Sequence, residues 1–392
     1  MRGAEPLGLG SIATGPDLGG GPSIQVCTDV GACSCWIWSA LCLEQLGFYR
    51  ARFLEPGRLL RSRPDVLLLS GRDPARLAQD LGRVQMAKIR DWVSAGGFFL
   101  GINAGAYLAL RSLTSPGPRL DLVRAQIANL MEAPTDAGPP EGNLTPCGGR
   151  HIRHAVEGEV ILDMEGTAVT APLLGGPCWS GVEDGRVRAR YLGWAEGAGL
   201  LTDERSARDV LIGKGAAISA RLGKGVAWLI GPHLEHPSYP GANDCLGRVL
   251  MQASHRTAAV MEEPRGMEQV AAARRLLSEA RVALRGLEMA GERLGKVEPG
   301  GEGVRRFLDA MWERVQAPEE DGLRLLLPDT MEADLSGMVR TIRGMRRDLA
   351  LGLDAGSEED LLLESASCCA SSFFNAYFDW RLRASLARKR RG

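Results

Sequence analysis

Three short segments of the chain hold residue types that could do chemistry at one site. The third segment places His233 two residues before Glu235. In an extended segment, residues two apart point to the same side, so the side chains of His233 and Glu235 are expected to lie side by side. The segments are Leu69-Ser70-Gly71-Arg72, Gly101-Ile102-Asn103-Ala104-Gly105-Ala106-Tyr107 and Gly231-Pro232-His233-Leu234-Glu235-His236-Pro237.

The middle segment predicts a sharp turn from a strand into a helix. The apolar run 98–102 ends at Asn103, and small residues surround it at Gly101, Ala104 and Gly105. Such a turn needs small neighbours because the backbone approaches itself closely, and it presents one side chain at the top of a sheet. Asparagine tolerates the positive φ that this turn demands, but its amide nitrogen is no nucleophile. The sequence therefore predicts that the turn presents a side chain without a reactive atom.

The elements around these segments indicate an α/β fold with a mainly parallel sheet and helices on both faces. Short apolar runs alternate with helical patterns, which is typical of βαβ units. The loop-rich stretch 114–150, with one short helix near 120–131, is expected to overhang the strand ends, and the strands that follow predict antiparallel additions. The predicted strands and helices are 24–27, 36–46, 66–69, 80–95, 98–102, 160–162, 168–170, 187–192, 217–222 and 225–230.

The pattern changes after about Thr257, where strand signals stop and amphipathic helices begin. Apolar residues lie on one stripe over 267–294, 304–315 and 331–353, and a last helix is predicted from Ser357 to about Ala387. A chain of 392 residues exceeds what one core usually organises. We therefore expect a flexible N-terminal segment at 1–22, an α/β domain at 23–258 and a helical domain at 262–392.

The three segments together resemble the active site of class I glutamine amidotransferases. Within that superfamily, the chain is most similar to the amidotransferase-like domain at the N-terminus of some biotin-protein ligases, which has a Gly-x-Cys-Ala-Gly-Ala-Tyr turn. The resemblance covers roughly 230 residues, about one domain. Further matching segments are Asp29-Val30-Gly31-Ala32, Ile89-Arg90-Asp91-Trp92-Val93, Gly175-Gly176-Pro177 and Ala189-Arg190-Tyr191.

This resemblance implies a flavodoxin-like arrangement in which Asn103 occupies the nucleophile position, His233 is the general base and Glu235 orients it. Because the family's cysteine is absent, covalent amide hydrolysis is not expected. Backbone N–H groups near Gly71 and Ala104 could still face a pocket, and an arginine at 72 could clamp an anion. The predicted ligand-binding positions are Gly71, Arg72, Ala104, Tyr107 and Gly176.

Composition narrows the class of protein. The formal net charge is -1, from 47 Lys plus Arg and 48 Asp plus Glu, so no global field favours nucleic acid or an anionic membrane. No signal peptide or membrane-spanning run is found by inspection, and nine scattered cysteines fit reduced thiols, so a cytoplasmic protein is expected. The cysteine spacing matches no standard zinc pattern, so neither a metal nor a cofactor is predicted.

The preferred hypothesis is an amidotransferase-like pseudoenzyme that binds a small ligand, with an anion as one candidate, at the former active site. The helical domain would then serve a protein partner or self-association, with its basic end, Arg381 to Arg391, read as a solvated helix terminus. One alternative is an active amide hydrolase or amidotransferase that uses Cys33 or a water activated by His233 and Glu235. Another is a scaffold with an idle pocket. Biotinylation is not expected, since no Gly-Arg-Gly-Arg motif occurs.

Overall fold

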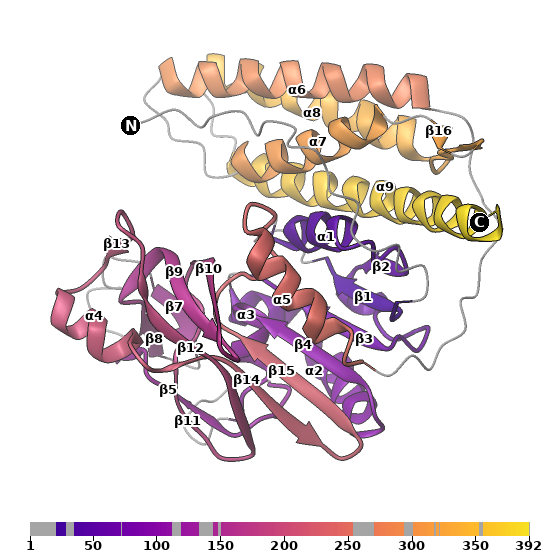
Figure 1. The fold of residues 1–392 in the computed structure, drawn as a ribbon. Helices are drawn as coiled ribbons and strands as arrows, with labels where there is room; N and C mark the ends of the chain where they lie inside the picture. Colours follow the sequence, from indigo (N-terminus) through magenta and orange to yellow (C-terminus); the bar gives the residue numbers. More distant parts are fainter. Residues whose placement is uncertain are drawn as a thin grey trace.

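The structure is a computed structural model in which a mixed β-sheet with flanking helices lies beside four further helices (Figure 1). No helix among the described residues is long and apolar enough to cross a membrane. The described residues are 21–28, 35–71, 73–111, 119–132, 144–147, 150–253, 270–293, 301–316, 319–320, 322–352 and 356–391.

One half of the sheet is parallel and follows the order β15-β4-β3-β1-β2. Its inner strands β1, β3 and β4 are buried at every residue, which explains why they appear in the sequence as continuous apolar runs. The predicted strands at 24–27, 66–69, 98–102 and 225–230 are confirmed at the same bounds. These strands are β1 (Ile24–Cys27), β2 (Ala51–Leu54), β3 (Val66–Leu69), β4 (Phe98–Ile102) and β15 (Gly225–Ile230).

The other half is antiparallel and continues from β15 through β14, β12, β9 and β10. It supplies the loop that carries Leu174 and Gly176 to the carboxyl end of the parallel strands. The strands are β14 (Gly215–Leu222), β12 (Gly185–Trp194), β9 (Val156–Met164) and β10 (Thr167–Leu173), with β5 (Ala125–Ile127), β11 (Trp179–Val182) and β13 (Gly199–Leu200) pairing beside this path.

The segment near 120–131 is a correction to the sequence analysis, which predicted a short helix there. The structure has two short strands instead, β5 and β6 (Leu130–Glu132). Strand β5 pairs with β11, and β6 joins a small sheet with β7 (Leu144–Cys147) and β8 (Arg150–Arg153). The conformation of this segment is determined by pairing with strands far along the chain, so its local periodicity could not predict it.

Helices cover both faces of the sheet. Helices α1 (Trp36–Gln45) and α5 (Pro240–Leu250) pack into one hydrophobic cluster, and α2 (Pro74–Ser94) and α3 (Ala104–Leu108) pack into a second one. Helix α2 begins six residues before the predicted start because the Asp73 carboxylate caps the N–H groups of Ala75 and Arg76, and it is interrupted at Gly82. A short helix α4 (Glu204–Leu211) lies beside β12.

Four helices form the C-terminal part of the molecule (Figure 1). The predicted helices at 267–294, 304–315 and 331–353 are present with ends shifted by at most three residues, and the last helix extends beyond Ala387. They are α6 (Val270–Arg293), α7 (Gly301–Val315), α8 (Met331–Ala350) and α9 (Gly356–Arg391), with a two-strand ribbon of β16 (Glu319–Glu320) and β17 (Leu323–Arg324).

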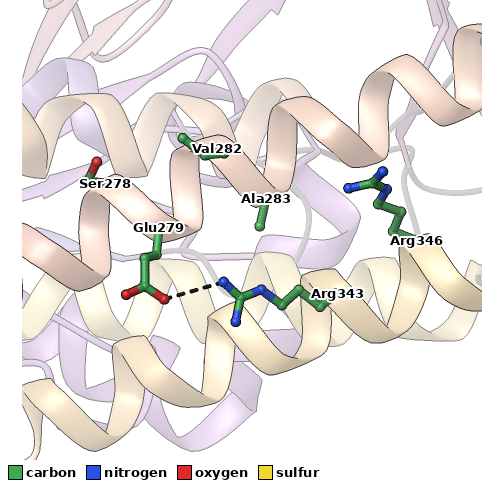
Figure 2. A pocket seen from close by; sticks show the side chains of 6 residues that line it. All are labelled: Ser278, Glu279, Val282, Ala283, Arg343 and Arg346. Atoms are coloured by element: carbon green, nitrogen blue, oxygen red, sulfur yellow. Dashed lines mark hydrogen bonds and ion pairs between the residues drawn. The ribbon is translucent and has the colours of Figure 1, made fainter.

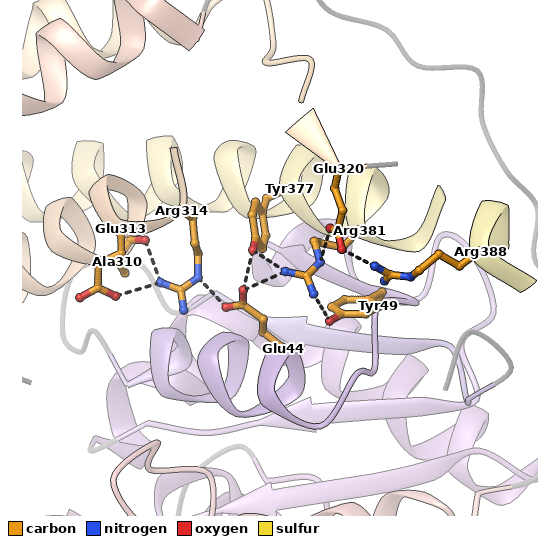
Figure 3. A network of polar contacts seen from close by, with 9 residues as sticks. All are labelled: Glu44, Tyr49, Ala310, Glu313, Arg314, Glu320, Tyr377, Arg381 and Arg388. Carbon is orange, nitrogen blue, oxygen red and sulfur yellow. Dashed lines mark hydrogen bonds and ion pairs between the residues drawn. The ribbon is translucent and has the colours of Figure 1, made fainter. Parts of the chain in front are cut away.

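The helical part and the α/β part share one continuous hydrophobic cluster. Trp36 of α1 packs against Phe307 of α7 at a ring distance of 5.3 Å, and Phe53 of β2 packs against Phe378 of α9 at 5.0 Å. A polar network borders this apolar contact (Figure 3). In it, the Glu44 carboxylate accepts hydrogen bonds from Arg314 Nε at 2.5 Å and from the Tyr377 hydroxyl at 2.6 Å.

Helix α9 also covers the outer edge of the sheet at strand β2. The Asn375 side chain accepts from the Phe53 N–H at 2.9 Å and donates to the Phe53 carbonyl at 2.8 Å. The Ser371 hydroxyl donates to the same carbonyl at 2.9 Å. One asparagine thus replaces a neighbouring strand at this residue, which closes an edge that would otherwise be open to pairing with another chain.

Candidate functional site

The turn between β4 and α3 places Asn103 at the carboxyl end of the parallel strands. Its backbone has φ 50° and ψ -106°, a strained conformation for a non-glycine residue. The turn is tight, since a Cβ on Gly105 would lie 2.1 Å from the Leu69 carbonyl oxygen, and one on Gly101 would lie 2.6 Å from the Gly105 oxygen. These contacts explain why the positions around Asn103 are small.

His233 follows β15 and is joined to Glu235 by a hydrogen bond of 2.8 Å between Nδ1 and Oε1. The His233 N–H donates to the Pro172 carbonyl at 2.8 Å, which ties this segment to β10. Both side chains are fully buried, with 0% exposed. The structure therefore brings together the two residues that the sequence analysis paired.

Asn103 contacts this pair directly. Its Nδ2 lies 3.0 Å from His233 Nε2 and donates to the Leu174 carbonyl at 2.8 Å. Only the amide nitrogen can satisfy the Leu174 oxygen, so the same nitrogen donates its second proton to Nε2. His233 is then the neutral tautomer that carries its proton on Nδ1 and donates it to Glu235. The three side chains form one chain of hydrogen bonds in which no atom is a nucleophile.

The backbone N–H of Ala104 is placed differently from the expectation. The Ala104 N–H donates to the Gly71 carbonyl at 3.1 Å, so it does not face a pocket in this conformation. Arg72 lies outside the described residues, and its predicted anion contact has no structural description here. Tyr107 is buried in α3, with 1% of its surface exposed.

Gly176 lies in a turn that packs directly on the His233 segment. A Cβ at Gly176 would lie 1.8 Å from the Gly231 carbonyl oxygen, so only glycine fits. The buried Asn129 fixes this turn by accepting from the Cys178 N–H at 2.8 Å, and the Tyr191 hydroxyl donates to the Pro177 carbonyl at 3.1 Å. Asn129 was missed in the sequence analysis because it lies in the segment assigned to a helix.

Two further residues near the site, Trp38 and Arg306, were also missed, and His236 was named only as part of the third segment. Trp38 of α1 lies edge-on to the His233 ring at 5.2 Å and 4.5 Å from the His236 ring. On its other side, the Arg306 guanidinium of α7 lies 4.8 Å from the Trp38 ring, at cation–π distance. Burial is the main cause that lowers the pKa of His236 to about 4, and the positive charge of the nearby Arg306 adds to it. No local motif connects Trp38 and Arg306 to His233, because they lie on helices α1 and α7, far from His233 in the sequence.

The thiols near the site are held protonated. Burial, together with the charges of Glu235 and Asp244, raises the pKa of Cys42 well above its usual value. Burial also raises the pKa of Cys178 to about 12. Cys35 is disulfide-bonded, contrary to the expectation that every thiol is reduced. Cys33, the alternative nucleophile, lies outside the described residues.

Several buried polar atoms at this edge of the sheet have no hydrogen-bond partner within the described part of the chain. They include Asn103 Oδ1, Ser70 Oγ and Glu235 Oε2. Ser70 and Asn103 end adjacent parallel strands, since Leu69 pairs with Gly101. A buried polar atom without a partner costs about 1–3 kcal/mol, so donors from another molecule would be favourable there.

A defined cavity lies well away from these residues, in the helical domain (Figure 2). It has a volume of about 310 Å³ and is lined by α6 and α8. Glu279 and Arg343 form an ion pair of 3.3 Å across it. Val282 also lines it and is 72% exposed, so this is a shallow groove on the helix surface. Among the described residues, no group of three or more His, Cys, Asp or Glu side chains is placed to hold a metal ion.

Comparison with known proteins gives only weak similarity. No protein-family model and no curated protein matches the chain. A GH42 β-galactosidase from G. stearothermophilus is 13% identical at a TM-score of 0.35, and the match covers 62% of this chain and 32% of that one. A Thermoplasma acidophilum protein described as a GMP synthase subunit is 14% identical at a TM-score of 0.33, covering 59% of this chain and 92% of that one.

The chain thus spans about a third of the length of the β-galactosidases it matches. At these TM-scores the similarity carries no conclusion about fold family or activity. The α/β architecture and the site are therefore established from the residues and contacts of this chain alone.

Proposed function

We propose that the chain is an amidotransferase-like pseudoenzyme, with a flavodoxin-like α/β domain that binds a small ligand at a former active site instead of turning it over. The observation that carries the proposal is the 3.0 Å contact between Asn103 Nδ2 and His233 Nε2. A side-chain amide occupies the position where a nucleophile would meet its general base. The assignment to the biotin-protein ligase N-terminal family belongs to this proposal and rests on the sequence resemblance.

The chemistry of the site argues against turnover. A general base must accept a proton from the attacking group, but His233 Nε2 already accepts one from the Asn103 amide. The backbone N–H of Ala104, which would stabilise a developing oxyanion, donates to Gly71 instead. With Asn103, His233 and Glu235 all fully buried, an activated water has no route to a substrate in this conformation.

The unpartnered atoms support a binding role. Asn103 Oδ1 accepts hydrogen bonds only, and the Ser70 hydroxyl can donate or accept. A ligand that carries N–H or O–H groups matches this pair. An anion requires Arg72 in addition, so its position decides whether the ligand carries negative charge.

The contacts between α7 and Trp38 support a role for the helical domain in sensing whether a ligand is bound near Asn103. Arg306 stacks on Trp38, and Trp38 contacts both His233 and His236, so α7 closes the same region from outside. A ligand that enters near Asn103 must displace part of this cover, and α7 would move with it. Binding at the α/β domain would then alter the surface that the helical domain offers to a partner or to a second copy.

The first experiment tests the absence of catalysis. Glutaminase and general amidase activity should be undetectable in the wild type and in His233→Ala. Asn103→Cys restores a thiol beside His233 and is the variant most able to gain activity. Turnover by the wild type that disappears in His233→Ala would reject the pseudoenzyme proposal.

A second experiment tests ligand binding at this site. Carboxylates, nucleotides and amides are screened by thermal shift against the wild type and Ser70→Ala. A ligand of the former active site should raise the melting temperature of the wild type and have a smaller effect on Ser70→Ala. If no compound shifts either protein, the scaffold hypothesis replaces the binding hypothesis.

A further inference from the structure

A second cavity lies where strand β2 meets helix α9, between the two domains. Its volume is about 310 Å³, which is at the small end of the roughly 300–1,000 Å³ range of small-molecule sites. It adjoins the carboxyl end of a parallel strand and a domain interface, two places where ligands preferentially bind. The lining residues that matter for its chemistry are Arg52, Glu55, Arg58, Cys368, Ser372 and Asp379.

The frame of this cavity is rigidly built. Asn375 and Ser371 fix α9 to the backbone of Phe53 by hydrogen bonds of 2.8 to 2.9 Å. Arg52 forms an ion pair of 2.6 Å with Asp379 across the same interface. The walls from β2 and from α9 are therefore held in register with one another.

The remaining charged residues that line this cavity, Glu55 and Arg58, are exposed and carry opposite charges. Arg58 follows β2 in the short 3₁₀ helix Pro56–Arg58, and its guanidinium makes no ion pair or hydrogen bond with another described residue, although its backbone N–H donates to the Glu55 carbonyl. Ser372 likewise has its hydroxyl available within the described part of the chain. Glu55 has Oε1 3.8 Å from the Cys368 thiol, and its second oxygen has no described partner. Burial and the charge of Glu55 raise the pKa of Cys368 to about 11, so the thiol is neutral near pH 7.

The equal number of positive and negative side chains in this cavity limits which class of ligand can bind. Two arginines face two carboxylates, so a phosphate-like polyanion would meet Glu55 and Asp379, and a metal ion would meet Arg52 and Arg58. A molecule with one positive and one negative group avoids both repulsions. It can place each charge against an unpaired side chain of opposite sign.

We propose that the cavity between β2 and α9 binds a small zwitterion of the free α-amino-acid type. The ligand carboxylate contacts Arg58 and the Ser372 hydroxyl, and its ammonium group contacts Glu55. The ligand bridges the α/β and helical domains, so it stabilises their contact. This site is separate from Asn103, and it stands whether or not the former active site binds a ligand.

The test uses the full chain and the twenty common L-amino acids as probes. At least one of them should raise the melting temperature at pH 7.5, and its N-acetyl and carboxamide derivatives should not, since each lacks one charge. Titration calorimetry should then show a dissociation constant at least about tenfold higher in Arg58→Met than in the wild type, because a hydrogen bond to a charged group contributes about 1.5–3 kcal/mol. Arg61→Met, which alters an exposed arginine outside the cavity, is the matched control and should bind as the wild type does.

Other outcomes overturn the proposal. These are no shift with any of the twenty amino acids, equal affinity in Arg58→Met, or a shift caused by inorganic phosphate or Mg²⁺ alone. Ser70→Ala separates the two sites, because it alters the former active site and should leave amino-acid binding at Arg58 unchanged. Loss of binding in Ser70→Ala would instead place the amino acid beside Asn103.

Discussion

Two glutamates with little exposed surface occupy very different environments in this molecule, Glu44 with 13% of its side chain exposed and Glu235 with 0%. Glu44, at the domain interface, has both carboxylate oxygens in hydrogen bonds, one to Arg314 and one to Tyr377 (Figure 3). Glu235, beside His233, has one oxygen bonded and the other buried without a described partner. Both oxygens of Glu44 are thus satisfied, as expected of a structural element, whereas the cluster at the sheet edge keeps unsatisfied groups on Asn103, Ser70 and Glu235. Incomplete satisfaction is typical of sites whose geometry was selected for something other than stability.

The largest loss of stability is expected from removing Glu44 from the interface network. Glu44→Ala leaves the guanidinium of Arg314 buried without its main counter-ion, and removal of one partner from a buried pair costs about 3–5 kcal/mol. Urea unfolding should show this loss. The control is Glu313→Ala, which removes a second and more exposed partner of Arg314 and should cost about 0–1 kcal/mol. Equal losses in the two variants would contradict the comparison.

The next effect is a pH dependence that originates at His236. Its pKa is lowered from 6.5 to about 4 in the folded protein, so the unfolded chain binds a proton in this window and the folded chain does not. Stability should therefore fall as the pH drops from about 6.5 towards 4. At pH 5 the loss should be about 1–2 kcal/mol, allowing for partial solvent screening.

The measurement compares urea unfolding of the wild type and His236→Gln at pH 7.5 and pH 5. The variant lacks this titration and should lose less stability between the two values. Arg306→Leu removes one cause of the shift and should raise the pKa of His236, which NMR titration can detect. Parallel pH profiles for the wild type and His236→Gln would exclude the effect.

Asn103→Gly should have a moderate effect on stability. It removes the hydrogen bond to Leu174 and leaves His233 Nε2 buried without a donor, which costs about 1–3 kcal/mol. Glycine also relieves the positive φ at this position, so the net loss should be nearer 1 kcal/mol. Thermal unfolding checks the value. A loss as large as that of Glu44→Ala would mean that the Asn103 cluster is a structural element after all.

Ser70→Ala should have the smallest effect. The Ser70 hydroxyl is buried without a described partner, so its removal breaks no hydrogen bond and should change stability by less than about 0.5 kcal/mol in either direction. Urea unfolding at pH 7.5 gives the value. A loss above about 1 kcal/mol would show that the hydroxyl has a partner, such as a buried water, and that the cluster is better satisfied than the contacts indicate.

Much of the fold was predictable from local patterns. The inner strands β1, β3 and β4 are continuous apolar runs bounded by turn residues, and the helices α6 to α8 have strong amphipathic stripes. Strand β2, Ala51–Leu54, was not predicted because it lies at the sheet edge and alternates between buried and half-buried residues over only four positions. Strands β5 and β6 were not predicted because distant partners define them.

The site was predictable only where its residues belong to a motif. Asn103, His233 and Glu235 lie in two short segments, and the structure brings them into contact as the motif implies. Trp38 and Arg306 were not predictable, because their relation to His233 exists only once α7 packs on α1. The Ala104 N–H donates to the Gly71 carbonyl because of the orientation of one peptide group. Side-chain types do not determine that orientation.

The closure of strand β2 by Asn375 has a consequence for synthesis of the protein. The two groups that meet are 322 residues apart, so α9 is synthesised long after the strand that it covers. While the ribosome is still adding the middle of the sequence, the outer backbone of β2 and the Phe53 ring lack the contacts that α9 makes with them. Nascent or truncated chains should therefore depend on chaperones at this strand, and completed chains should not.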